Sequence, residues 1–264
     1  MSWEDAVSWL KSQPEHAELV RACFYDDPLL DAAERYSQSS EWRAIKTYLS
    51  DRGCNALDLG AGRGIASYAL AKEGYTVVAV EPDASNIVGA GAIRNLATES
   101  KLNIVVEQNW AEGLPFPNES FDVVHARQVL HHARDLNQLC SEACRVLKKG
   151  GLFIATREHV ISSKEDLAKF QDSHSLHKLY GGENAYLLKE YLDAITKGGV
   201  KVVKVLNPYE SDINLYPDTV NEARKRLAEK IKLPLFLVPK IFLKLRGALS
   251  NSPGRLYTFI GYKS

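Results

Sequence analysis

The spacing of apolar residues changes near residue 55 and divides the 264-residue chain into two regions. Before this point apolar residues recur every three or four positions, as Trp3, Val7 and Leu10 do, and this spacing predicts helices over residues 1–50. After it, short apolar runs alternate with helical patterns. The predicted strands cover residues 56–59, 76–80, 103–107, 121–125, 152–155, 200–205 and 256–262, and the predicted helices cover 65–72, 84–99, 135–147 and 187–194.

This alternation predicts an α/β fold with a Rossmann-like, doubly wound and mostly parallel sheet. The expected core domain comprises residues 51–206 and 256–264. Residues 1–50 are expected to form a helical lid, while residues 160–186 and 207–255 are inserted segments outside the sheet pattern. We expect the lid and both insertions to cover the carboxyl edge of the strands and to cap the substrate.

Composition and charge exclude several classes of protein. Lysine and arginine total 33, and so do aspartate and glutamate, so we expect no nucleic-acid partner. Glu4 and Asp5 near the amino terminus argue against a signal peptide. No segment is apolar enough for a membrane span, and we therefore expect a cytoplasmic protein that is a monomer or a homodimer. The four cysteines match neither a disulfide framework nor a zinc site.

One late stretch, residues 231–249, is rich in apolar residues but is interrupted by Pro234 and Pro239 and carries four basic residues. Its alternation of apolar and basic side chains allows three interpretations. The stretch can pack as a pair of core helices, contact a lipid-linked acceptor or mediate dimerisation. Core packing is the default expectation for apolar residues at helical spacing.

Glycines at positions 60, 62 and 64 follow the first predicted strand. They permit a tight turn and a close approach of the backbone to a ligand. A dinucleotide-binding loop carries its third glycine one residue later, where this chain has Ile65. The spacing therefore favours a nucleoside ligand without a pyrophosphate. Glu81 ends the second strand, where a carboxylate can accept hydrogen bonds from both ribose hydroxyls of an adenosine.

Five sequence blocks in order resemble the class I S-adenosylmethionine-dependent methyltransferases, in particular the type 11 group. The blocks are residues 57–64, 78–83, 111–124, 129–132 and 145–151, within a resemblance that covers about residues 53–160. The resemblance implies a seven-stranded sheet whose last strand is antiparallel. It also implies that the chain is a methyltransferase (EC 2.1.1.-) with S-adenosyl-L-methionine as cofactor.

The resemblance implies roles for residues around the cofactor. Gly60 and Gly62 should face it, Asp58 should organise the loop, and Glu81 should hold the ribose. Trp110 stands where the family often has an aspartate that meets the adenine, so stacking or backbone groups are expected to replace that contact. Arg35 is a candidate partner for the cofactor's carboxylate. The complete expected set is Arg35, Asp58, Gly60, Ala61, Gly62, Gly64, Glu81, Pro82, Trp110, Ala111, Glu112, Ala126 and Arg127.

Methyl transfer to a sugar hydroxyl usually needs a general base, and histidine is the natural base near neutral pH. The candidate catalytic residues are His131, His159, His174 and His177, although a structural or surface role is the default for each alone. The polar stretch 157–184 suits a hydrogen-bonding acceptor and resembles methyltransferases associated with bacterial surface-sugar pathways. Tyr25, Arg35 and Tyr36 are expected to close the site from the amino-terminal side.

The first hypothesis is therefore a methyltransferase for a small molecule or glycan, with O-methylation of a hydroxyl as the expected reaction. A nicotinamide-dependent oxidoreductase is an alternative that Ile65 and the later blocks disfavour. A non-catalytic cofactor-binding module is another, because an intact glycine loop indicates binding but not turnover. No metal is expected, since Ala126, Arg127 and Gln128 do not supply the carboxylate and amide cluster that metal-assisted O-methylation needs.

Overall fold

The computed structural model describes residues 1–49 and 54–264. The expected boundary between the lid and the core domain, at residues 50 and 51, lies outside these residues. The strands are β1 (Asn55–Leu59), β2 (Thr76–Val80), β3 (Ile104–Glu107), β4 (Phe121–Arg127), β5 (Leu147–Ile161), β6 (Tyr186–Leu187), β7 (Val200–Leu206) and β8 (Arg255–Lys263). Seven of them form a sheet in the order β3-β2-β1-β4-β5-β8-β7, and β6 pairs with β5 beside this path.

The pairing confirms the predicted fold class. Strands β3, β2, β1, β4 and β5 run parallel, whereas β8 is antiparallel to both β5 and β7. The chain moves outward through β2 and β3 and then returns to β4 on the other side of β1. Ligands bind at the carboxyl ends of strands where the order reverses in this way, so the topology directs attention to the ends of β1 and β4.

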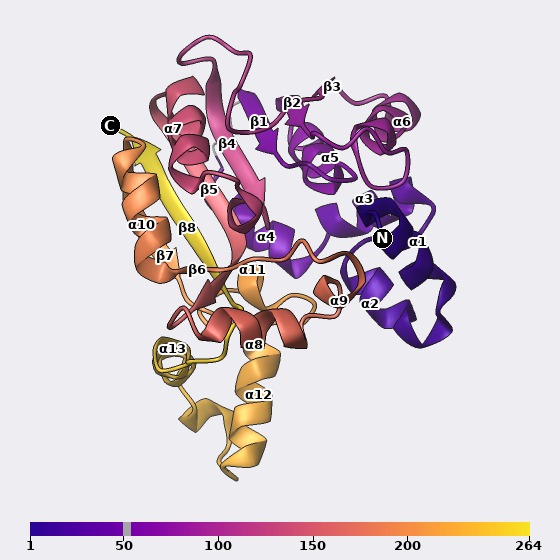
Figure 1. The fold of residues 1–264 in the computed structure, drawn as a ribbon. Helices are drawn as coiled ribbons and strands as arrows, with labels where there is room; N and C mark the ends of the chain where they lie inside the picture. Colours follow the sequence, from indigo (N-terminus) through magenta and orange to yellow (C-terminus); the bar gives the residue numbers. More distant parts are fainter. Residues whose placement is uncertain (50–53) are drawn as a thin grey trace.

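Helices cover both faces of the sheet (Figure 1). They are α1 (Trp3–Ser12), α2 (Ala17–Ala22), α3 (Leu29–Ser37), α4 (Ser40–Lys46), α5 (Ile65–Lys72), α6 (Ala90–Ser100), α7 (Leu136–Val146), α8 (Asp166–Ser173), α9 (His177–Tyr180), α10 (Leu188–Lys197), α11 (Asp212–Leu215), α12 (Val220–Lys230) and α13 (Lys240–Ala248), with 3-10 turns η1 (Pro14–His16), η2 (Leu130–His132) and η3 (Leu235–Leu237). One apolar core contains residues of α7 and α10, and the other contains residues of α3 to α6.

Two predicted elements differ from the structure for local reasons. The helix expected from residue 84 begins at Ala90, because Asp83 and Ser85 accept hydrogen bonds from the backbone nitrogens of Ser85 and Ile87, at 2.8 and 2.9 Å. Such side-chain bonds stabilise turns in competition with a helix. Strand β5 is much longer than expected, and its antiparallel partner β8 pairs with it from Leu152 to Val160.

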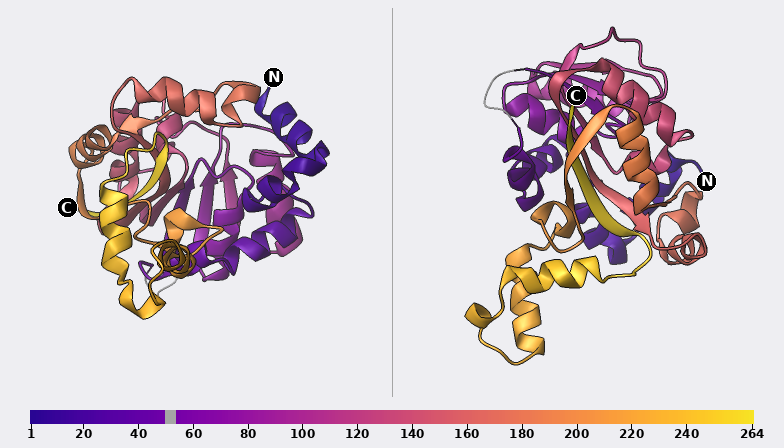
Figure 2. Two further views of the ribbon diagram at one scale, coloured as in Figure 1. Left: turned by 90° about the horizontal axis from the view of Figure 1, so that it is seen from below. Right: turned by 90° about the vertical axis from the view of Figure 1, so that its left-hand side faces the viewer.

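The segment 207–255 forms α11, α12, η3 and α13, and the last three project from the body of the protein (Figure 2). The expectation that residues 231–249 form a core helix pair is wrong. Val238 and Leu243 are buried, but most other apolar side chains of the stretch are exposed to solvent. No helix in the described part of the chain is long and apolar enough to cross a bilayer.

Candidate active site

A cavity of about 540 Å³ lies at the carboxyl ends of β1, β2 and β4. Its floor comes from the glycine loop after β1 and from Glu81 after β2. Its far end is lined by histidines of η2, β5 and the segment 160–186, together with Glu183. The amino-terminal helices and the segment 160–186 meet over it, since the Trp3 ring lies 4.6 Å from the Tyr180 ring. The cavity therefore joins two chemically different regions under one cover.

The glycine loop has the backbone that its sequence predicts. Gly60 and Gly62 both have φ near +55°, a left-handed conformation that favours glycine. A side chain at position 60 would also collide with Val129, 2.7 Å from an ideal Cβ. Asp58, at the end of β1, accepts a hydrogen bond from Ser67 in α5 at 2.6 Å and bonds His125 Nδ1 at 2.8 Å. Asp58 thus ties the loop to its neighbouring strand and helix, and His125 is buried, as expected for a structural residue.

Glu81 lines the cavity beside this loop. One carboxylate oxygen accepts a hydrogen bond from the Gly62 backbone nitrogen at 2.8 Å, and the other accepts one from the Asp83 backbone nitrogen at 3.0 Å. Burial raises the pKa of Glu81, and the two backbone hydrogen bonds oppose this rise. Each carboxylate oxygen can accept a further bond, so the fixed side chain can still receive two hydroxyl donors.

Trp110, which replaces the aspartate usual in the family, forms part of the cavity wall. The Trp110 ring lines the cavity and is 46% exposed. The Arg134 guanidinium covers the ring, with Cζ 3.6 Å from the ring centroid. Asn109, which sequence reasoning did not select, lines the same wall and bonds the Trp110 backbone nitrogen through Oδ1 at 2.8 Å. The wall therefore offers an aromatic surface and an amide in place of the aspartate usual in the family.

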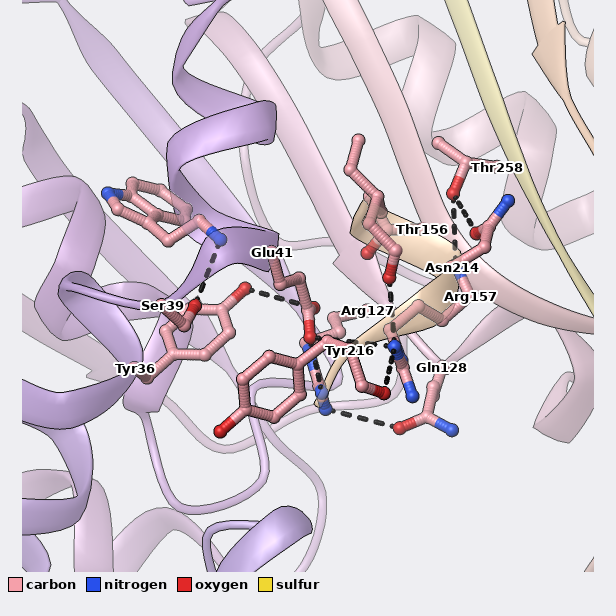
Figure 3. Close-up of polar contacts among 12 residues, drawn as sticks. Tyr36, Ser39, Glu41, Arg127, Gln128, Thr156, Arg157, Asn214, Tyr216 and Thr258 are labelled. Atoms are coloured by element: carbon pink, nitrogen blue, oxygen red, sulfur yellow. Dashed lines mark hydrogen bonds and ion pairs between the residues drawn. The ribbon is translucent and has the colours of Figure 1, made fainter. Parts of the chain in front are cut away.

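A buried ion cluster lies behind the end of β4 (Figure 3). Glu41 of α4 is fully buried and accepts hydrogen bonds from Arg127 Nε at 2.6 Å and Nη2 at 3.0 Å. Arg157 Nη1 lies 3.8 Å from the same carboxylate. Burial would raise the pKa of Glu41, but the two guanidinium groups outweigh it and lower that pKa. The cluster therefore holds two positive charges against one negative charge, and Arg127 also lines the cavity.

Two other arginines fasten the amino-terminal segment. Arg63 of the glycine loop donates to the carbonyls of Phe24 and Asp26, at 3.0 and 3.1 Å, and pairs with Asp27 at 2.5 Å. Arg35 does not line the cavity. Its guanidinium pairs with Asp26 through two hydrogen bonds of 2.9 and 2.6 Å, so its charge is neutralised within the segment rather than presented to a ligand.

His131 is the centre of a polar cluster at the far end of the cavity. Its Nδ1 lies 2.7 Å from Glu158 Oε2, and its Nε2 lies 3.7 Å from Glu183 Oε2. Burial opposes a charge on His131, but the two glutamates outweigh it and raise the pKa of His131 to about 9. Burial raises the pKa of Glu183, but His131 and His132 outweigh that effect and lower it. The cluster is thus a histidinium between two carboxylates.

The remaining cavity histidines are neutral near pH 7. Burial and the charge of His131 lower the pKa of His159 to about 3 and that of His132 to about 4. Burial also lowers the pKa of His174, whose Nδ1 has no hydrogen-bond partner among the described residues. The sequence predicted that His159 follows the fifth strand, but the longer β5 includes it, and its Nδ1 donates to the Gly254 carbonyl at 2.8 Å. His177 does not line the cavity.

The same cluster contains a set of groups that could hold a metal. His131, His159 and Glu183 each offer one ligand atom, and these atoms lie within 4.8 Å of one another. A proton on His131 places positive charge at this point, because its raised pKa keeps the ring protonated below pH 9. The expectation that no metal is used stays a prediction.

Most of the sequence-predicted site residues meet at this cavity. Those that line it are Asp58, Gly60, Ala61, Gly62, Glu81, Pro82, Trp110, Ala111, Glu112, Arg127, His131, His159, His174 and Tyr25. Those that do not line it are Arg35, Tyr36, Gly64, Ala126 and His177. Glu183 and the amino-terminal residues Trp3, Leu19, Cys23 and Phe24 were not selected from the sequence, although Glu183 lies in the polar stretch 157–184. No described residue of the segment 207–255 lines the cavity, although this segment was expected to cap the substrate.

Known proteins share both the sequence pattern and the fold. Residues 57–155 match the family described as methyltransferase domain. The uncharacterized methyltransferase YcgJ of Bacillus subtilis is 36% identical over 118 residues, which cover 42% of this chain and 43% of that protein. The ubiquinone biosynthesis O-methyltransferase of Brucella anthropi is 31% identical over 159 residues, which cover 58% and 62%. The chain thus spans about half the length of the curated relatives that it matches.

Among solved structures, the complex between the Haloferax volcanii Trm112 methyltransferase activator and the putative methyltransferase contains a similar fold. The TM-score is 0.60 at 16% identity, and the match covers 92% of this chain and 97% of that one. At this identity the likeness concerns the fold alone. The matched domain, the five sequence blocks and the sheet order agree: residues 57–155 carry a methyltransferase domain, and the chain has S-adenosylmethionine-dependent methyltransferases of class I as homologues.

Proposed function

We propose that this protein transfers the methyl group of S-adenosylmethionine to a hydroxyl of a small molecule or glycan. The observation that carries this proposal is the single cavity that joins the glycine loop and Glu81 to the histidine and glutamate cluster. The first region suits a nucleoside, and the second suits an acceptor rich in hydrogen-bonding groups. A shared cover over both regions would exclude water from the reaction.

The residues at the glycine loop fit the cofactor. Gly60 and Gly62 leave the backbone open to a ligand, and Glu81 has free lone pairs for ribose hydroxyls. Asn109 and Trp110 offer an amide and a ring to an adenine. When bound there, S-adenosylmethionine supplies an already activated methyl group, so the main task of the protein is alignment.

Arg127 replaces Arg35 as the proposed partner of the cofactor's carboxylate. Arg127 lines the cavity, and the Arg127–Glu41–Arg157 cluster carries one positive charge in excess. A buried excess of positive charge favours a carboxylate nearby. Arg35 cannot serve in the same way while it pairs with Asp26.

His174 is the proposed general base. It faces the cavity, it is neutral near pH 7, and its Nδ1 has no hydrogen-bond partner among the described residues, with Glu183 Oε1 4.0 Å away. His131 is already protonated at that pH and so cannot accept a proton. His159 donates from Nδ1 to the Gly254 carbonyl, which leaves Nε2 as its basic atom, but the nearby charge on His131 disfavours a second positive ring. His131 and Glu183, which line the cavity, are proposed to orient the acceptor hydroxyl, while Glu158 holds the His131 ring in place.

Incubation of the protein with S-adenosylmethionine and panels of sugars, phenols and amines tests this reaction. We expect S-adenosylhomocysteine to form together with a product methylated at oxygen, identified by mass spectrometry and NMR. Methylation of amines alone would contradict the proposed acceptor class while preserving the methyltransferase activity. No described residue of the segment 207–255 lines the cavity, so the proposed reaction requires none of its side chains. The protein is proposed to be a monomer or a homodimer.

A further inference from the structure

The projecting hairpin formed by α12, η3 and α13 carries an unusual concentration of exposed apolar side chains. In the described part of the chain, fourteen large apolar side chains are exposed, and eight of them lie between residues 231 and 249. They are Ile231, Leu233, Phe236, Leu237, Ile241, Phe242, Leu245 and Leu249. Exposed apolar side chains gathered in one place mark an interaction site rather than ordinary surface.

The apolar side chains on α13 are turned away from the body of the protein. Ile241, Leu245 and Leu249 follow one another at a spacing of four residues, so they share one face of the helix. The opposite face is buried at Gly247, which packs so closely on Asn207 that an added Cβ would lie 2.1 Å from its Oδ1. Asn207 Nδ2 also donates to the Lys244 carbonyl at 3.0 Å. These contacts fix which face of α13 meets solvent.

The tip of the hairpin is held in place while its apolar residues point outward. Arg224 of α12 donates from Nε to the Val238 carbonyl at 2.9 Å and from Nη2 to the Leu235 carbonyl at 3.2 Å. Val238 is fully buried, whereas Phe236 is 80% exposed. The exposed phenylalanine therefore belongs to an ordered turn that the protein builds with an internal arginine.

The charges beside these apolar residues are mostly positive, with Glu222 and Glu229 of α12 as the acidic residues of the hairpin. Residues 231–249 contain Lys232, Lys240, Lys244 and Arg246 and no acidic residue, in a chain of zero net charge. Lys244 pairs with Glu210 at 2.7 Å, and the Arg246 guanidinium lies over the Tyr209 ring. Lys232 and Lys240 have no ion pair with any residue that the structure describes. The hairpin thus presents apolar side chains and uncompensated positive charge together.

We propose that this hairpin docks on the surface of an anionic lipid bilayer. Apolar side chains beside lysines suit the boundary between acyl chains and negatively charged headgroups, because both components gain from contact there. A symmetric contact between two copies would bring two sets of these lysines into one interface, and residues 231–249 supply no acidic group to pair them. Nucleic acid would satisfy the lysines but would leave the leucines and phenylalanines without an apolar partner.

Docking would bring the cavity close to the bilayer. The hairpin lies on the side of the sheet toward which β4 points (Figure 1). Six residues after the end of α13, the Gly254 carbonyl accepts the hydrogen bond of His159, which lines the cavity. This arrangement suits an acceptor presented at a membrane surface. The proposal itself concerns the hairpin alone and does not depend on the reaction assigned to the cavity.

Sedimentation of the full chain with phospholipid vesicles tests the proposal. We expect binding to vesicles that contain phosphatidylglycerol, weaker binding to pure phosphatidylcholine, and loss of binding at high salt. Replacing Phe236 and Leu237 with aspartate should weaken binding by about tenfold or more, since it removes two exposed apolar groups that would enter the bilayer and adds negative charge. Replacing Val105 and Val203 with aspartate is the matched control, because both valines are exposed and lie on β3 and β7.

Three results would overturn the proposal. The first is a wild-type protein that stays in solution with the anionic vesicles. The second is equal binding by the Phe236→Asp, Leu237→Asp variant and its valine control. The third is a wild-type dimer that the hairpin variant converts to monomers while vesicle binding is absent, which would assign the surface to a second copy. Equal thermal midpoints of the wild-type protein and the variants show that each is folded, and this control separates the test from that of the proposed function.

Discussion

Nδ1 of His131 lies 2.7 Å from a carboxylate oxygen of Glu158, and both side chains are almost completely buried. The same carboxylate group accepts hydrogen bonds from the backbone nitrogens of Val129, at 3.0 Å, and His131, at 3.1 Å. Glu158 of β5 therefore fixes both the ring and the backbone of η2, the turn that follows the end of β4. The position of η2 at one end of the cavity depends on this buried pair.

The pair predicts how stability changes with pH. The pKa of His131 in the folded protein is raised to about 9, above an ordinary value near 6.5. Its contribution is therefore complete below about pH 6.5 and is lost as the pH rises through about 9, by up to about 3 kcal/mol in the free energy of unfolding. Urea unfolding at pH 6 and pH 9.5 measures this loss. The His131→Gln variant should lose much less over the same range, and parallel losses in both proteins would contradict the assignment.

Substitution of His174 tests its proposed role as the general base, and substitution of His177 is the matched control. They lie three residues apart, yet only His174 lines the cavity. His174→Gln should lower kcat by about a hundredfold at saturating cofactor, a typical contribution of a general base, and should leave the affinity for S-adenosylmethionine unchanged. His177→Gln should leave kcat near the wild-type value. Equal rates for all three proteins would remove His174 from the mechanism.

Glu81 is expected to govern cofactor affinity. Glu81→Gln removes the charge that strengthens bonds to two hydroxyl donors, so the Kd for S-adenosylmethionine should rise by about ten- to a hundredfold. Calorimetric titration measures this change. Glu107→Gln is the control, since Glu107 ends the neighbouring strand β3 but does not line the cavity. An unchanged Kd in Glu81→Gln would contradict the proposed ribose contact.

Arg63 is expected to hold the amino-terminal segment against the glycine loop. Arg63→Met keeps most of the side-chain volume but removes the hydrogen bonds to the Phe24 and Asp26 carbonyls and the ion pair with Asp27. Limited proteolysis should then cut within residues 17–28 faster than in the wild-type protein, because local opening costs less. Arg43→Met is the control, as the Arg43 side chain is outside this contact and donates to the Gln38 carbonyl. Identical cleavage rates in both variants would contradict this role.

The purified protein is predicted to carry no stoichiometric metal at the His131, His159 and Glu183 cluster. Elemental analysis by mass spectrometry should detect well under one zinc, manganese or iron per chain, and EDTA should not change the thermal midpoint. Bound zinc that is lost in Glu183→Gln would contradict this prediction and would assign the site to His131, His159 and Glu183.

Local patterns were sufficient to predict that the glycine loop and Glu81 lie together at one end of the cavity. The glycines at 60 and 62 and the acid at 81 lie at strand ends, so their place in the fold follows from the alternation of strands and helices. The parallel order of β1, β2 and β4 then brings them together without further information. The length of β5 was less predictable, since its extension depends on β8, almost a hundred residues later.

The acceptor end and the cover depend on contacts between distant segments. The sequence suggested Arg35 as a partner for the cofactor's carboxylate, but Arg35 forms an ion pair with Asp26. Only the folded structure reveals that pairing. Glu183 was one polar residue among many until the structure placed it beside His131. The apolar stretch 231–249 followed a helical pattern that is equally compatible with a core and with an exposed interface, and only the fold distinguishes the two.

Calorimetric titration of the purified protein with S-adenosylmethionine, with NADH as the comparison, tests the central claim most directly. The account predicts saturable, one-to-one binding of S-adenosylmethionine and no binding of NADH. Binding of NADH together with no detectable heat from S-adenosylmethionine would contradict the account, because the glycine loop and Glu81 would then serve a nicotinamide cofactor.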